Sequence, residues 1–234
     1  MSTALVLAAV GYGFVGVVVG VFLNWAGCWL LQRRAREQDS PILLFTPSPQ
    51  PLGSSAPLSR WMVVMGGAGF AGLWVMYGAS VQTIVISGYF SVFLLIFALD
   101  ITYRWVPNAL LWPTAVLVLT VSVLTGQPPL VRALLGGVVG FVWFYLIAIA
   151  YRGALGAGDV KLAALIGLMT GFPGVVTALT LGILFGGSSA ALLLISGQKT
   201  RKSYIPYAPF LVTGALLTLV FGAQLTSLSS LSGW

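Results

Sequence analysis

Residues 130–167, LVRALLGGVVGFVWFYLIAIAYRGALGAGDVKLAALIG, contain the two features that decide the fold class. The first part, residues 130–151, carries a single charge, Arg132, and is long enough to cross a membrane, which takes about 20 apolar residues in a helix. Asp159 then opens a second apolar run directly after two glycines. The stretch therefore predicts membrane helices and raises the question of why a carboxylate is kept at the start of one.

The whole chain has the composition of a polytopic membrane protein. Of its 234 residues 59% are hydrophobic and only 6% are charged, whereas soluble domains carry about 25% charged residues. We expect an all-α fold with about eight transmembrane helices in one domain, 1–234. The predicted segments are 4–31, 61–80, 82–101, 107–125, 130–151, 159–172, 174–196 and 205–228.

The basic residues predict the orientation. If the N-terminus lies outside and every segment crosses, ten of the eleven lysines and arginines face the inner side and only Arg132 faces outward. Such a bias is typical of cytoplasmic loops, so we assign the net charge of +7 to topology and expect no nucleic-acid partner. Residues 159–172 would span only about 21 Å of a core about 30 Å thick. The charge bias nevertheless favours a crossing.

Small residues recur at helix-packing distance. Gly16 precedes Gly20 by four residues, and Gly136 precedes Gly140 by four. Small residues at this spacing let helices approach closely in lipid. We expect these glycines to serve packing and not chemistry.

Two of the four acidic residues lie where a membrane helix meets the inner face. Glu37 and Asp39 belong to the polar stretch 32–60, and we expect them to be solvated. Asp100 ends the third apolar segment and Asp159 begins the sixth, so the predicted topology puts both at the same level. A carboxylate at such a position is unfavourable unless something compensates it or uses it.

The residues themselves leave two interpretations open for these aspartates. Asp159 could cap its helix, and either acid could pair with a nearby cation, Arg104 or Lys161. Alternatively, two neighbouring carboxylates share one proton and act as acid and base on a water molecule. Histidine is absent and Cys28 is the only cysteine, which excludes a serine triad and a cysteine-cluster metal site; we therefore assign no metal.

Gly156 and Gly158 precede Asp159 and suggest a place for a substrate. Glycine allows torsions with positive φ and close approach of another backbone. A peptide must be extended to be cleaved, so these glycines predict a slot beside the acid. The alternative is an ordinary turn before a helix.

Four stretches resemble the type IV prepilin peptidases, bacterial GxGD-type aspartic proteases of the membrane. GVVVGVFLNWAGCWLLQRR is similar to the first helix of this family, and YIPYAPFLVTGALLTL is similar to its last. ALDITYRWVPNALLWP resembles the first aspartate motif, with Asp100 seven residues before Pro107 and with Asn108 after it. LGAGDVKLAALIG resembles the second, G-x-G-D-x-K-L.

The resemblance implies a function and a location. It implies that Asp100 and Asp159 are the catalytic pair of an endopeptidase that needs no cofactor for proteolysis. The substrates would be prepilins or pseudopilins, whose short basic leader is cut at the cytoplasmic face of the bacterial inner membrane. Besides these partners the protein would contact membrane lipid. The motif residues Gly156, Gly158, Lys161, Pro107 and Asn108 are expected to shape the site, although the sequence does not define the role of Lys161.

The chain departs from the family in its cytoplasmic loop. Many members carry two CxxC pairs there, associated with zinc and with bifunctional enzymes, but residues 32–60 contain no cysteine. Methylation of the new N-terminus, which would require S-adenosylmethionine, is therefore left open. Gly153 stands where many members have a glutamate.

Two other functions fit parts of the sequence. Presenilin-type GxGD proteases usually show Y-D and P-A-L motifs, where this chain has Leu99–Asp100 and Pro209–Phe210–Leu211. A transporter or ion pathway could also use intramembrane aspartates, but the chain shows no convincing internal repeat of the kind common in transporters.

Overall fold

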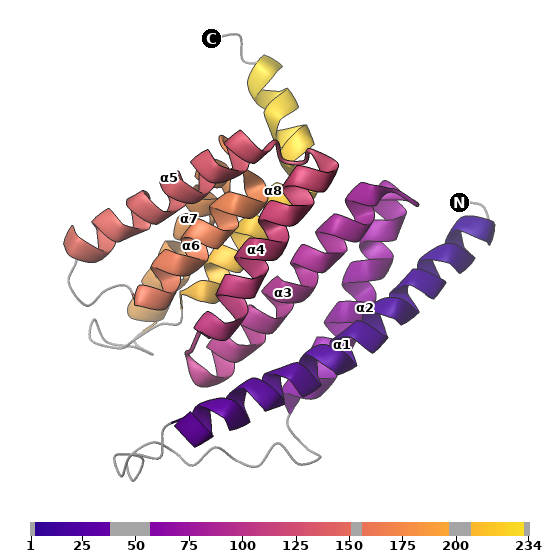
Figure 1. Cartoon of the computed structure of the whole chain (residues 1–234), viewed down its shortest axis with the longest axis horizontal. Helices are drawn as coiled ribbons and strands as arrows, with labels where there is room; N and C mark the ends of the chain where they lie inside the picture. Colours follow the sequence, from indigo (N-terminus) through magenta and orange to yellow (C-terminus); the bar gives the residue numbers. More distant parts are fainter. Residues whose placement is uncertain (1–2, 38–56, 151–155, 197–206, 232–234) are drawn as a thin grey trace. The chain divides into compact units, whose positions relative to one another are not determined.

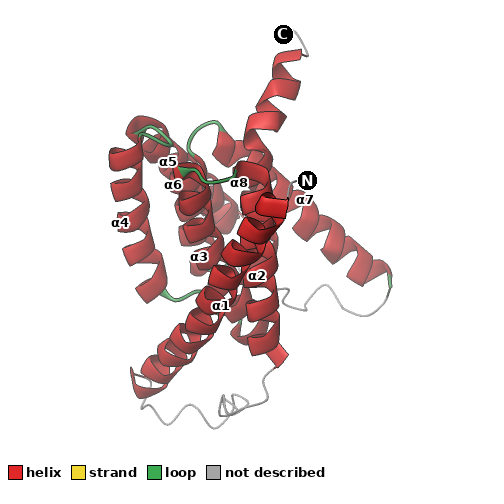
Figure 2. Ribbon diagram, turned by 90° about the vertical axis from the view of Figure 1, so that its right-hand side faces the viewer, coloured by secondary structure: helices red, strands yellow, loops and turns green. Residues whose placement is uncertain are grey.

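The computed structural model describes residues 3–37, 57–150, 156–196 and 207–231, and over these ranges every regular element is a helix (Figure 2). The all-α prediction is thereby confirmed. The helices are α1 (Thr3–Glu37), α2 (Pro57–Tyr77), α3 (Val81–Tyr103), α4 (Asn108–Thr125), α5 (Leu130–Ala150), α6 (Ala157–Thr170), α7 (Gly174–Ile195) and α8 (Ala208–Leu231).

Five of these helices are long and apolar enough to cross a membrane, as a multi-pass protein requires. They are Thr3–Arg33 of α1, α3, α4, α5 and Gly174–Leu192 of α7. Shorter apolar stretches lie at Trp61–Tyr77 in α2 and Ala208–Gly222 in α8. The 14 residues of α6 are fewer than a full crossing requires. Its crossing and the orientation of the chain stay predictions.

Several helices begin or end at other residues than the predicted apolar segments. The apolar run of α1 ends at residue 31, but the helix continues to Glu37, because Gln, Arg, Ala and Glu are good helix formers. Helix α2 begins at Pro57, a residue type that suits the first helical position. Both ends of the predicted loop 32–60 are therefore helical, and its middle lies outside the described residues.

The chain divides into two compact units, Met1–Ala98 and Leu99–Trp234, with the boundary inside α3. In the first unit, α1 packs along α2. A Cβ on Gly16 would overlap the carbonyl of Gly66, and one on Gly20 would lie 2.8 Å from the carbonyl oxygen of Met62. The predicted close packing at these two glycines is confirmed. The description of the whole chain as one domain stays a prediction.

In the second unit, α6 contacts α4, α5, α7 and α8 (Figure 1). Side chains on several sides of α6 are buried, among them Leu162, Ala163 and Ile166. Its contact with α5 is close because Gly136 faces Gly167 and Gly140 faces the carbonyl of Ala163. The short helix that carries Asp159 is therefore held by neighbours on several sides.

Candidate active site

Asp100 lies in the last turn of α3, just before the chain reverses. The N–H of Arg104 donates to the carbonyl oxygen of Asp100 at 2.8 Å. Arg104 has a φ of 50°, a left-handed conformation that ends the helix. Buried Pro107 then has extended torsions and caps α4, which begins at Asn108. The first aspartate motif is thus a short connector between two helices.

Asp159 lies in the first turn of α6 and caps that turn. Its Oδ2 accepts a hydrogen bond of 3.1 Å from the N–H of Gly156, the residue before the helix. This contact is the acidic half of a capping box, in which a side chain satisfies a free N–H at the helix start. The prediction that Asp159 caps its helix is confirmed, and the cap holds the carboxylate in one position.

The structure brings the two aspartates together. Asp100 is 6% exposed and Asp159 is 5% exposed, and their carboxylates interact electrostatically. The N–H of Ala208, the first residue of α8, donates to Asp100. The end of α3 and the starts of α6 and α8 therefore meet around a pair of buried acids.

One carboxylate oxygen of the pair has no hydrogen-bond partner in the described part of the chain. Oδ2 of Asp100 is buried and has no hydrogen-bond partner among the described residues. An unsatisfied buried oxygen is costly, and two interacting carboxylates resist being ionised together. A proton shared by the pair, or a water molecule bound to it, would satisfy this oxygen. The arrangement can therefore supply one acid and one base.

The remaining motif residues lie where α4 begins beside α6. Lys161 Nζ donates to Asn108 Oδ1 at 2.9 Å. A Cβ placed on Gly158 would lie 3.5 Å from the Cβ of Val106, an ordinary contact. These contacts join the start of α4, and Val106 just before it, to the first turns of α6.

The glycines before Asp159 do not use the torsions that glycine alone allows. Gly156 is extended, with φ −79° and ψ 149°, and Gly158 is helical. The start of α6 needs only an extended residue followed by helix, so the backbone here does not itself require glycine. The predicted slot for a substrate backbone therefore depends on the space left by the missing side chains of Gly156 and Gly158. It does not depend on their backbone torsions.

Tyr207, directly before α8, was not among the residues predicted to form the site. The Tyr207 ring packs against Phe144 and Phe210, with centroid distances of 6.4 and 6.5 Å, and covers Gly186. The Tyr207 phenol also interacts electrostatically with Asp159. The usable signal was a tyrosine near the start of the predicted segment 205–228, on the predicted membrane side of both acids.

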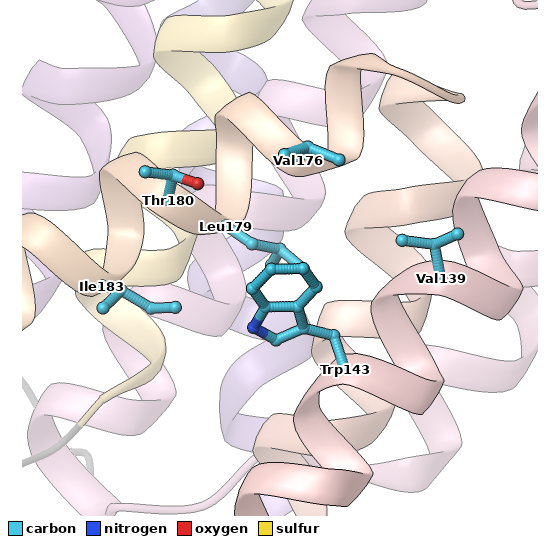
Figure 3. A pocket seen from close by; sticks show the side chains of 6 residues that line it. All are labelled: Val139, Trp143, Val176, Leu179, Thr180 and Ile183. Atoms are coloured by element: carbon cyan, nitrogen blue, oxygen red, sulfur yellow. The ribbon is translucent and has the colours of Figure 1, made fainter.

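A small hollow lies between α5 and α7 (Figure 3). Its free volume of about 10 Å³ has room for about one water molecule. The lining offers one hydroxyl group and no charge, so it does not fit a nucleoside cofactor. Its side chains are Val139, Trp143, Val176, Leu179, Thr180 and Ile183.

The model of the type IV leader peptidase family matches residues 85–192. This segment contains both aspartates together with Asn108 and Lys161. The resemblance inferred from the motifs is confirmed by this match.

Curated relatives carry one shared name, prepilin leader peptidase/N-methyltransferase. A Bacillus subtilis protein is 25% identical over 158 residues, 68% of this chain and 64% of its own length. A Xanthomonas campestris protein is 26% identical over 204 residues, 84% of this chain and 66% of its own. A Burkholderia pseudomallei protein is 25% identical over 177 residues, 74% of this chain and 56% of its own. The chain thus spans about three fifths of the length of these relatives, and no solved structure gives a significant match.

Proposed function

We propose that this chain is a member of the type IV leader peptidase family and acts as an aspartic endopeptidase on prepilins or pseudopilins. One observation carries the proposal: Asp100 and Asp159, which come from two separate motifs, interact as a buried pair inside the segment that matches the family. The names of the relatives support a peptidase and give no support to a transporter or ion pathway.

The two carboxyl groups divide the chemistry of peptide hydrolysis. The ionised carboxylate takes a proton from a water molecule while the water oxygen bonds to the scissile carbonyl carbon. The protonated carboxyl donates its proton to the carbonyl oxygen, giving a neutral tetrahedral intermediate. When the C–N bond breaks, the carboxyl group that took the proton from water gives it to the leaving nitrogen. The other carboxylate takes a proton from a hydroxyl group of the intermediate, which restores the starting protonation state of the pair. No protein group beyond the two aspartates has to change its protonation state.

Backbone N–H groups hold the two carboxyl groups in position for this reaction. Asp159 is fixed by the N–H of Gly156 and Asp100 by the N–H of Ala208, each at the start of a helix. Donors set in advance need no reorganisation during the reaction. Oδ2 of Asp100 has no partner among the described residues, and we assign it the contact with water or with the substrate carbonyl.

We place the site at the cytoplasmic face of the bacterial inner membrane. The charge bias of the loops supports this side, and the leader of the expected substrate is basic and enters from the cytoplasm. Prepilins or pseudopilins and membrane lipid are the proposed partners, and we propose none among nucleic acids.

A second activity, N-methylation, is named in the relatives and would use S-adenosylmethionine as methyl donor. The hollow between α5 and α7 does not fit this cofactor, because it lacks both volume and charged groups. We assign no residue to the cofactor and derive no step through it. Mass spectrometry of the mature product decides the point, since methylation adds the mass of one methyl group.

Cleavage in detergent tests the proposed function. The purified full chain is incubated with a full-length prepilin, and the product is analysed by mass spectrometry and N-terminal sequencing. We expect a single cut that removes the short basic leader. An intact prepilin, together with proton flux when the protein is placed in liposomes, would favour the transport alternative.

A further inference from the structure

The contact between Lys161 and Asn108 joins the two aspartate motifs. Its atoms, Lys161 Nζ and Asn108 Oδ1, lie 2.9 Å apart, although the residues are 53 positions apart in the sequence. Lys161 follows Asp159 by two residues in the first turns of α6, and Asn108 is the first residue of α4. The bond therefore connects the starts of two helices at the end of the unit that holds the acids.

The chain between Asp100 and Asn108 has little freedom to absorb a shift at either end. It leaves α3 through the left-handed Arg104 and reaches α4 through buried Pro107. Val106 between them lies against Gly158 of α6. If the first turn of α4 moves relative to α6, this connector transmits the movement to Asp100, while Asp159 stays with its own helix.

We propose that Lys161 and Asn108 form a clamp that sets the spacing of the two catalytic carboxylates. Lys161 is thus a positioning residue and not a group that touches the substrate. This deepens the proposed function and rests on it. The side chain of Lys161 is exposed, so the clamp adds little to overall stability. The clamp contributes to the rate by holding the two carboxylates at the right spacing, because small displacements of reacting groups lower the rate strongly.

A double-mutant cycle tests the clamp. Lys161→Met, Asn108→Ala and the double variant are compared with the wild-type protein for kcat and KM on a prepilin and for thermal stability in detergent. Each single variant is expected to lower kcat about tenfold, because misplaced reacting groups lose rate, with KM and thermal stability nearly unchanged. The double variant should lose no more kcat than the less active of the two single variants, because both substitutions break the same hydrogen bond.

Two further variants separate the clamp from a general charge effect. Asn108→Asp should have a higher kcat than Asn108→Ala, because a carboxylate also accepts a hydrogen bond from Lys161. This advantage should vanish when Lys161→Met is added. Arg33→Met, which removes a cation from the same predicted membrane side, should not reproduce the loss in kcat. If the losses of Lys161→Met and Asn108→Ala multiply, or if Lys161→Met raises KM and Asn108→Ala has no effect, the clamp is wrong.

A measurement without catalysis keeps the clamp and the proposed function apart. Asp100→Cys and Asp159→Cys are combined in a Cys28→Ser background and joined by a short thiol cross-linker. Adding Lys161→Met or Asn108→Ala should lower the cross-linking rate several-fold, and an unchanged rate would overturn the clamp. A cross-link that depends on Lys161 and Asn108, together with a wild-type protein that does not cleave prepilin, would contradict only the proposed function.

Discussion

At the scale of the residue, Asp159 combines two tasks that the sequence presented as alternatives. Its carboxylate caps α6 through the N–H of Gly156 and also interacts with Asp100. The cap uses one carboxylate oxygen, so it does not exclude a catalytic role and gives the acid a fixed position. The two interpretations of Asp159 are therefore compatible.

A methyl group added at Gly158 tests the predicted substrate slot. In Gly158→Ala the new Cβ would make only an ordinary contact with Val106, and alanine is favoured over glycine in a helix by about 1 kcal/mol. We expect a thermal midpoint in detergent at or above that of the wild type. Cleavage of a prepilin should fall about tenfold or more, because the methyl group occupies space that the substrate backbone needs. An unchanged kcat/KM would show that the substrate backbone does not pass close to Gly158.

The pair of acids could be predicted from the sequence, but their surroundings could not. Asp100 and Asp159 stood out because the chain keeps only four acidic residues. The bond between Lys161 and Asn108 depends on how α4 packs on α6, which no local pattern contains. Tyr207 was missed for a similar reason, since its ring meets Phe144 of another helix.

At the scale of the element, the apolar segments predicted each helix but not its ends. Hydrophobicity begins the sixth segment at Asp159, whereas the helix begins at Ala157, directly after the capping residue Gly156. In the same way α1 runs past its apolar part to Glu37. Helix ends depend on capping and on intrinsic propensity, which a hydrophobicity profile does not measure.

The seam between α5 and α6 gives a prediction at this scale. In Gly140→Ala the added methyl would overlap the carbonyl of Ala163 and push the helices apart. We expect a loss of about 1–3 kcal/mol in stability, typical of overpacking, and reduced cleavage because α6 carries Asp159. Thermal unfolding in detergent measures the first effect.

The matched control lies on α7. Gly187 has nothing within 4 Å of an added Cβ, so Gly187→Ala should leave the thermal midpoint unchanged or raise it slightly. Equal midpoints for the two alanine variants would show that the α5–α6 seam tolerates wider spacing than we infer.

At the scale of the whole molecule, the sequence predicted a multi-pass helical membrane protein but not its division into two units. The division depends on contacts between helices, and the boundary falls inside the continuous helix α3. Both aspartates belong to the second unit, together with the last turn of α3 and the helices α4 to α8. Composition sufficed for the fold class because so few charges remain in the chain.

Cysteine labelling tests the predicted orientation. In a Cys28→Ser background, a single cysteine at Gln127, in the connection between α4 and α5, should react in intact cells with a maleimide that cannot cross the membrane. A cysteine at Ser54 should react only after the cells are permeabilised, because the charge bias puts residues 32–60 inside. The opposite pattern would place the two acids on the outer side and contradict access from the cytoplasm.

Removing one acid at a time tests the central claim most directly. Asp100→Asn and Asp159→Asn keep the size of each side chain but cannot exchange the proton that the reaction requires. Each variant is purified in detergent, checked for wild-type elution on gel filtration, and incubated with a prepilin under conditions in which the wild type completes cleavage. We predict that the prepilin stays intact with either variant. Cleavage at the wild-type rate by either one would show that Asp100 and Asp159 are not the catalytic pair.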